Sequence, residues 1–214
     1  MKKWVIIISI ALFVIIGSSV YFFKSQNNSS NNNYSAEKTS TKKQEDHKNQ
    51  SNTNTTPTPS APTEAEEIAS FSTKIYTKDS NRQNNISITC SSLNNTDISN
   101  GETFSFCNTV GRSSPNKGYK KADIFANGKK IKGYGGGNCQ ISTTLYNAVL
   151  SVPSLQVTER HEHSNKVPYI QNGKDAAVSY GSYDFKFVNN TGNNIRIKAI
   201  NSPNEVTIKI IKLI

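Results

Sequence analysis

The 214-residue chain carries 25 lysine and arginine residues against 15 aspartate and glutamate residues, which gives a formal net charge of +10. Three cysteines are too few for a disulfide-dense miniprotein, and a single apolar block with a polar remainder excludes a multi-pass membrane protein. The sequence contains no collagen period, heptad run or repeat at a fixed spacing. Its length is sufficient for one or two domains.

Two lysines precede an uncharged run of 20 residues from Trp4 to Phe23. As a helix this run rises about 30 Å, which matches the hydrocarbon thickness of a bilayer. The doubled lysine before it, against a single lysine after it, favours a cytoplasmic N-terminus. We therefore predict that residues 1–24 form an uncleaved signal anchor, a transmembrane helix, and that the rest lies outside the cytoplasm. A cleaved signal peptide is the alternative, although the apolar core is longer than usual for one.

Residues 25–67 are rich in Asn, Ser, Thr, Lys, Gln and Pro, with few large apolar side chains. Such a composition cannot bury enough apolar surface to offset the entropy lost on ordering. We predict a disordered linker with a root-mean-square span on the order of 35 Å and an extended length of about 150 Å. A linker of this reach would hold a domain at residues 68–214 within the inner cell wall.

The positive charge lies mainly in the predicted domain. Residues 68–214 contain 18 basic and 9 acidic residues, whereas residues 1–67 contain 7 and 6. Six lysines fall within a short stretch that only Asp123 opposes: Lys117, Lys120, Lys121, Lys129, Lys130 and Lys132. Outside a membrane, such a face is suited to anionic wall polymers or lipid head groups, and we expect no nucleic-acid partner. The alternative is an ordinary solvated lysine face.

Hydrophobic periodicity divides residues 68–214 into short elements. It predicts a strand over 70–77, a helix over 81–93, a turn and strand within 98–111, and a hairpin around Asn127-Gly128. Apolar residues at i, i+4, i+7 and i+8 predict a second helix between the glycines at 135–137 and Pro153. Further strands are predicted from residue 157, near 176–180 and 185–187, and in a closing hairpin over 195–199 and 206–210. The predicted fold class is α+β, a single small domain with a mixed or antiparallel sheet of roughly seven strands and two short helices.

Cys139 is the candidate nucleophile, because it stands at the predicted start of the second helix. Backbone N–H groups and the helix dipole stabilise a thiolate at such a position. The residues before it are three glycines, Gly135, Gly136 and Gly137. Glycines let the backbone approach a substrate closely and supply N–H donors to an oxyanion. Cys139 shares its helix face with Thr143 and Tyr146, which we include with the glycines as candidate binding residues.

His161 and His163 are the candidate general bases, since the third histidine lies in the predicted linker. If their segment is a strand, both side chains point to the same side. Asp175 or Asp184 would orient the ring, and the order of cysteine before histidine is that of papain-like enzymes. The sequence therefore predicts a thiol site made of Cys139, His161 or His163, and Asp175.

Two other interpretations of these residues stay open. Cys139, His161 and His163 are able to supply three ligands to a metal ion, although we expect no metal or other cofactor. Alternatively, Cys139 is a buried structural thiol and the histidines are only hydrogen-bonded. Because the number of cysteines is odd, at least one thiol is free or intermolecular, and Cys90 and Cys107 are the pair that could form a disulfide.

Six ordered blocks of sequence carry a family resemblance. They are IASFSTKIYTKDSNRQNNI (68–86), NGETFSFCNTVG (100–111), KGYKKADIFANGK (117–129), GGGNCQISTTLYNAVL (135–150), ERHEHSNKVPY (159–169) and GKDAAVSYGSYDFKFVNNT (173–191). Together they resemble the VanW family over nearly the whole predicted domain. The chain departs from the family pattern at Cys107, where an Asn is usual, and at Asn138, where an apolar residue is expected. The first departure argues against a catalytic asparagine at that position.

The resemblance implies an envelope protein of Gram-positive bacteria, in a family named after an accessory protein encoded with B-type vancomycin-resistance genes. The resemblance indicates where the protein is located more clearly than which reaction it catalyses. We predict a membrane-anchored, extracytoplasmic protein linked to peptidoglycan modification and glycopeptide resistance, acting as a Cys139-dependent hydrolase or transferase on amide bonds of stem peptides. The alternative is a non-catalytic module that binds peptidoglycan or anionic wall polymers through Lys117, Lys120 and Lys121.

Overall fold

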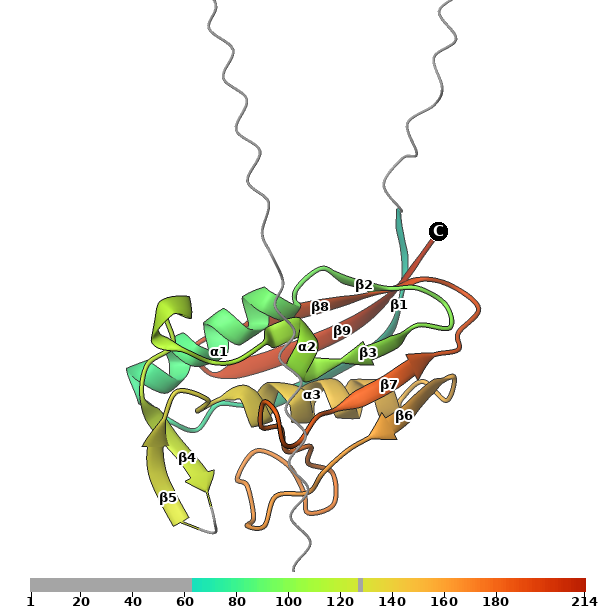
Figure 1. Cartoon of the computed structure of the whole chain (residues 1–214). Coiled ribbons are helices and arrows are strands. Elements are labelled where there is room, and N and C mark those ends of the chain that lie inside the picture. The colour runs from blue at the N-terminus through green and yellow to red at the C-terminus, as the bar shows by residue number, and fades with distance from the viewer. Residues whose placement is uncertain (1–62, 127–128) are drawn as a thin grey trace, which may run out of the picture. The chain divides into compact units, whose positions relative to one another are not determined.

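The structure is a computed structural model that describes residues 63–126 and 129–214 (Figure 1). The predicted membrane anchor and nearly all of the predicted linker lie outside these residues, as does the Asn127-Gly128 turn. Within the two ranges, no helix is long and apolar enough to cross a bilayer.

The described chain forms nine strands, three α-helices and one short 3₁₀ turn. The strands are β1 (Glu64–Lys74), β2 (Thr96–Ile98), β3 (Thr103–Ser105), β4 (Ala122–Ala126), β5 (Lys129–Gly133), β6 (Leu155–Glu159), β7 (Lys186–Asn189), β8 (Ile195–Asn201) and β9 (Glu205–Leu213). The helices are α1 (Ser80–Leu93), α2 (Phe106–Val110) and α3 (Asn138–Leu150), and the 3₁₀ turn is η1 (Pro115–Lys117).

The strands form antiparallel sheets. This confirms the α+β class, and of the two predicted possibilities, a mixed or an antiparallel sheet, it selects the antiparallel one. A four-stranded sheet has the order β1-β9-β8-β2, a three-stranded sheet has the order β3-β7-β6, and β4 pairs with β5 as a hairpin. Helix α1 packs against β8, and α3 packs against β1 and β9, so both helices cover the larger sheet (Figure 1). The β4–β5 hairpin extends away from that sheet near the start of α3.

The closing hairpin and the two longer helices follow the predicted periodicity. The inward residues of β8 and β9 are buried: Ile195, Ile197, Ala199, Val206, Ile208 and Ile210. The predicted stripe of α3 is buried too: Ile141, Leu145, Ala148 and Val149. Each large aliphatic side chain buried in this way contributes roughly 1.5–3 kcal/mol of transfer free energy. The carboxylate of Asp79 accepts the backbone N–H groups of Asn81 and Arg82 and so caps the first turn of α1.

Two segments differ from the prediction. The strand expected within 98–111 has only three residues in β3, because the chain turns into α2 at Phe106. The Ser105 hydroxyl accepts the Asn108 N–H and Asp184 accepts the Cys107 N–H, so side chains cap the new helix. The strand expected near 176–180 is also wrong, since only isolated bridges at Ala177 and Ser179 form there.

Strand β1 begins at Glu64, within the last residues that composition assigned to the linker. Backbone pairing with β9 extends to Leu213 at this end. Carboxylates on β1 meet basic side chains of the same sheet: Glu64 lies beside Arg196 and Lys198 of β8. Pairing and charge therefore order a segment whose own side chains bury little apolar surface.

Candidate functional site

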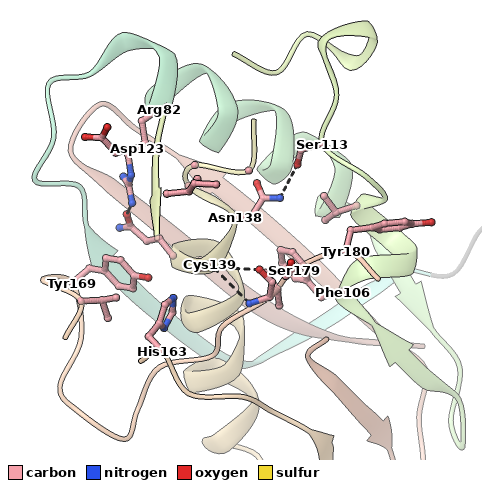
Figure 2. Close-up of a pocket in the computed structure, with 18 of the residues that line it drawn as sticks. Arg82, Phe106, Ser113, Asp123, Asn138, Cys139, His163, Tyr169, Ser179 and Tyr180 are labelled. Atoms are coloured by element: carbon pink, nitrogen blue, oxygen red, sulfur yellow. Dashed lines mark hydrogen bonds between the residues drawn. The ribbon is translucent and has the colours of Figure 1, made fainter. Parts of the chain in front are cut away.

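A cavity of about 760 Å³ opens at the N-terminus of α3 (Figure 2). Its wall brings together distant parts of the sequence, with Arg82 from α1, Phe106 from α2, Lys130 from β5, Cys139 from α3 and His163 from the loop that joins β6 to β7. The lining also includes Gly135, Gly136 and Gly137. The predicted nucleophile thus lies in the wall of a cavity large enough for a peptide-sized ligand.

The glycines before Cys139 allow α3 to begin in close contact with its neighbours. Gly137 caps the helix at φ +116°, and a Cβ there would lie 2.8 Å from Cγ1 of Ile86 on α1. A Cβ on Gly136 would lie 2.8 Å from Cβ of Ala122 on β4, whereas one on Gly135 would meet nothing within 4 Å. Side chains at 136 and 137 would therefore push the start of α3, and Cys139 with it, out of place.

Cys139 is half-buried and contacts the segment that follows β6. Its thiol donates to the Val178 carbonyl at 3.4 Å and accepts the Val178 N–H at 3.5 Å. The Cys139 backbone N–H has no hydrogen-bond acceptor among residues 63–126 and 129–214. This N–H is thus available in the first turn of α3, where an oxyanion donor is useful.

His163 is held by Asp175 through both its ring and its backbone. The ring Nδ1 donates to Oδ2 of Asp175 at 2.6 Å, and the His163 backbone N–H donates to the same oxygen at 2.6 Å. Arg160 donates to the other carboxylate oxygen at 3.1 Å. With Nδ1 engaged in this way, Nε2 is the ring nitrogen that remains for Cys139.

The electrostatics of this pair favour a charged imidazole beside a carboxylate. Burial lowers the pKa of His163, but the Cys139 thiol and Asp175 together raise it by more, so the pKa lies above its usual range. Burial raises the pKa of Asp175, but hydrogen bonds from His163 outweigh this effect and leave the pKa lowered. Both shifts stabilise the imidazolium–carboxylate pair that forms when His163 takes a proton.

His161 is not part of this arrangement. Its Nε2 donates to Glu159 at 3.0 Å, and its ring lies 4.7 Å from the ring of Tyr183. Lys186 and His161 lower the pKa of Glu159 to about 2. The structure therefore separates the two histidines. The strand that would have placed both side chains on one side is not formed, because the chain makes only a single bridge at His161.

The proposed three-ligand metal set is not assembled either, because His161 faces Glu159 rather than Cys139. Within the described part of the chain, no group of three or more His, Cys, Asp or Glu side chains has an arrangement that could hold a metal ion. Cys90, Cys107 and Cys139 are all free thiols in the structure, so the suggested disulfide between the first two is not formed.

Comparisons with known proteins bear on the whole domain. The family model described as "VanW like protein" matches residues 81–211. The chain belongs to the VanW family. The match includes Cys139, His163 and Asp175, and it confirms the resemblance drawn from the six sequence blocks.

Two curated relatives align with part of this VanW-family chain. The uncharacterized protein YoaR of Bacillus subtilis (strain 168) is 40% identical over 134 residues, which are 63% of this chain and 44% of YoaR. The vancomycin B-type resistance protein VanW of Enterococcus faecalis (strain ATCC 700802 / V583) is 35% identical over 116 residues, 52% of this chain and 42% of that protein. The aligned region thus spans less than half of each relative. No solved structure matches.

Three other residues predicted for the site are absent from the cavity lining. Thr143 is buried, and its hydroxyl accepts the Ala176 N–H at 2.9 Å, which ties α3 to the segment after Asp175. The guanidinium carbon of Arg160 lies over the ring of Tyr146, 5.3 Å from the ring centroid. Asp184 accepts the Cys107 N–H and caps α2 instead of orienting a histidine. These three side chains therefore have structural contacts: they hold the segment after Asp175, pack against Arg160 and cap α2.

Five of the six clustered lysines divide into two groups, and the sixth, Lys129, is exposed. Lys130 and Lys132 pair with Asp123 at 2.8 Å and 2.7 Å. Lys117, Lys120 and Lys121 are exposed and lie outside the cavity lining. The Asp123 carboxylate balances part of the charge of the first group, whereas the second group stays exposed to solvent.

Sequence reasoning missed three cavity residues, Arg82, Gln140 and Tyr169. An Arg82 guanidinium nitrogen donates to Oε1 of Gln140 at 2.8 Å, and Gln140 follows Cys139 directly. Arg82 is the one charged residue of α1, which is the signal that could have drawn attention to it. Tyr169 lies six residues beyond His163 in an irregular loop, where no periodicity marks it.

Proposed function

We propose that this protein is a thiol-dependent enzyme of the cell wall that hydrolyses or transfers amide bonds in peptidoglycan stem peptides. The observation that carries the proposal is the hydrogen-bonded His163–Asp175 pair beside Cys139, in a cavity at the start of a helix. This arrangement supports the proposal, because thiol acyl-transfer enzymes combine a nucleophile with a base and a carboxylate that orients the base.

The proposed reaction transfers one acyl group through Cys139, and His163 carries the protons. Nε2 of His163 takes the proton of the Cys139 thiol, and the thiolate attacks the amide carbonyl while the Cys139 N–H stabilises the oxyanion. His163 then gives the proton to the leaving amine, and a thioester remains on Cys139. Water, or a second amine in the transfer reaction, then attacks the thioester while Nε2 of His163 takes a proton from it. The C–S bond breaks, the acyl product leaves, and His163 returns the proton to the Cys139 thiolate. Asp175 stabilises the imidazolium that forms in each stage.

The proposal that the substrate is in the cell wall rests on the named relative and on the predicted anchor, not on the geometry of the site. One relative carries the name vancomycin B-type resistance protein VanW. The predicted anchor and linker would place the domain outside the cytoplasm, within reach of peptidoglycan. The proposed substrate class follows from joining this location to acyl-transfer chemistry.

A second candidate function is non-catalytic binding to the wall. The exposed side chains of Lys117, Lys120 and Lys121 favour it, because they form a basic surface outside the cavity. Such binding would weaken in salt and would not need Cys139.

The test uses the full-length chain in detergent with purified peptidoglycan sacculi, followed by mass spectrometry of released and retained muropeptides. Wild type and a Cys90→Ala control should produce the same mass change, and Cys139→Ala should produce none. Absence of any change with folded wild type would overturn the enzymatic proposal. Sedimentation of the same proteins with sacculi, and of a Lys117→Glu/Lys120→Glu/Lys121→Glu variant, would then test the binding function.

A further inference from the structure

Arg82 presents a guanidinium group to the cavity beside Cys139. Its hydrogen-bond partner is the neutral Oε1 of Gln140 at 2.8 Å. Gln140 is held in turn, because its amide donates to the Thr73 hydroxyl and to the Lys74 carbonyl, each at 3.0 Å. The chain therefore builds a specific support for Arg82 from β1 and α3.

The described residues supply no carboxylate partner to this guanidinium. The ion pairs that involve arginine within residues 63–126 and 129–214 are those of Arg160 and Arg196. Burial lowers the pKa of Arg82 by more than the nearby Asp79 charge raises it, and the guanidinium forms no ion pair with the described residues that would compensate for the lost solvation. A charge in this state is stabilised by an anionic ligand that enters the cavity.

Tyr169 adds a second donor on the same side of the cavity. Figure 2 shows Arg82 and Tyr169 on one side of Cys139, with Tyr180 on the other. Burial raises the pKa of Tyr169, so its phenol remains protonated and able to donate. A planar guanidinium with a neighbouring hydroxyl matches the two oxygens of a carboxylate.

The charge of the cavity agrees with an anionic ligand. Four basic residues line it, Lys74, Arg82, Arg112 and Lys130, against one carboxylate, Asp123. Asp123 is already paired with Lys130 at 2.8 Å. The remaining charge is positive, and Arg82 is a cavity arginine whose guanidinium is hydrogen-bonded to Gln140, the residue that follows Cys139.

We propose that Arg82 and Tyr169 form a subsite for the free terminal carboxylate of a peptide whose nearby amide carbonyl reaches Cys139. The inference rests on the proposed function and narrows it to peptides with an uncapped carboxyl end. The bond attacked would then lie close to that end and not in the interior of a cross-linked strand.

The experiment measures binding without turnover, using the full-length Cys139→Ala variant and isothermal titration calorimetry. The probes are two N-acetylated stem-peptide pentapeptides that differ only in a terminal carboxylate or carboxamide. We expect the acid to bind about 10- to 100-fold more tightly than the amide. Adding Arg82→Gln should remove this preference, Arg82→Lys should restore part of it, and Arg112→Gln, on the Tyr180 side, should keep it.

Equal binding of the acid and the amide to Cys139→Ala would overturn the inference. This comparison uses Cys139→Ala alone, so it does not depend on whether an Arg82 variant folds. A different outcome would assign Arg82 to the thiolate instead: slower alkylation of Cys139 by iodoacetamide in Arg82→Gln, with the acid preference unchanged. If wild type fails to alter sacculi while the acid preference persists, the enzymatic proposal fails and the carboxylate subsite stands.

Discussion

One carboxylate oxygen of Asp175 receives both the ring Nδ1–H and the backbone N–H of His163, each at 2.6 Å. The double contact sets the rotation of the imidazole as well as its tautomer, since an ionised carboxylate only accepts. Arg160 holds the other oxygen at 3.1 Å, so the carboxylate cannot turn away. The arrangement orients the free ring nitrogen before any substrate binds.

The two histidines offer a matched pair of variants. His163→Ala should reduce the rate of muropeptide conversion by about 10²- to 10⁴-fold, because the proposed base is lost. His161→Ala removes a histidine two residues away that contacts Glu159 instead, and its rate should stay near that of wild type. Time courses of product mass spectra give both rates. Equal losses in the two variants would contradict the assignment of His163 as base.

The raised pKa of His163 makes stability depend on pH. In the folded state the imidazole keeps its proton above the ordinary pKa of 6.5, so protonation stabilises the fold. This contribution is fully present below about pH 6.5 and is lost as pH rises through the folded pKa. The difference in unfolding free energy between wild type and His163→Gln should therefore shrink from pH 6 to pH 9.

Urea denaturation at several pH values measures that difference. His161→Gln serves as the control for loss of a histidine elsewhere in the same loop. A gap between wild type and His163→Gln that widens with rising pH would reverse the sign and contradict the pKa assignment.

Local hydrophobic periodicity was sufficient to predict the elements whose burial is set by residues close together in the sequence. The stripe from Ile141 to Val149 and the alternation in β8 and β9 report burial directly, so α3 and the closing hairpin were predicted well. Helix α2 was missed because its cap includes Asp184, which lies 77 residues beyond the Cys107 N–H that it accepts. No local window contains that information.

The same distinction separates the site residues. The glycine run before Cys139 is a local signal, and it pointed to the cavity. The choice between His161 and His163 depends on Asp175, which reaches back across an irregular loop. Arg82 joins the site only through the packing of α1 beside α3, which periodicity does not reveal.

The three free thiols should react in a definite order. Burial raises the pKa of Cys90 and of Cys107 to about 12, so neither forms much thiolate near neutral pH. Cys139 stands at a helix start beside His163 and lines the cavity. Limiting iodoacetamide at pH 7, followed by peptide mass spectrometry, should therefore label Cys139 first.

Unfolding the protein in urea provides the control for that order, since all three thiols should then react at similar rates. Faster labelling of Cys107 than of Cys139 in the folded protein would contradict the proposed activation by the helix start and His163.

The glycines before Cys139 differ in what a methyl group would meet, and stability should follow that difference. Gly137→Ala places an L residue at φ +116° and against Ile86, and Gly136→Ala presses on Ala122. Each should cost about 1–3 kcal/mol of unfolding free energy. Gly135→Ala meets open space and should change it by less than about 0.5 kcal/mol.

Urea denaturation of the three variants checks this order, and iodoacetamide labelling reports whether Cys139 keeps its place. Because Gly136 and Gly137 press against β4 and α1, their variants should also slow the labelling, whereas Gly135→Ala should not. If Gly135→Ala were as damaging as Gly137→Ala, the glycine run would act through flexibility or ligand contact, and close packing would not explain it. The pattern across the three positions thus separates a packing role from a binding role for the glycines.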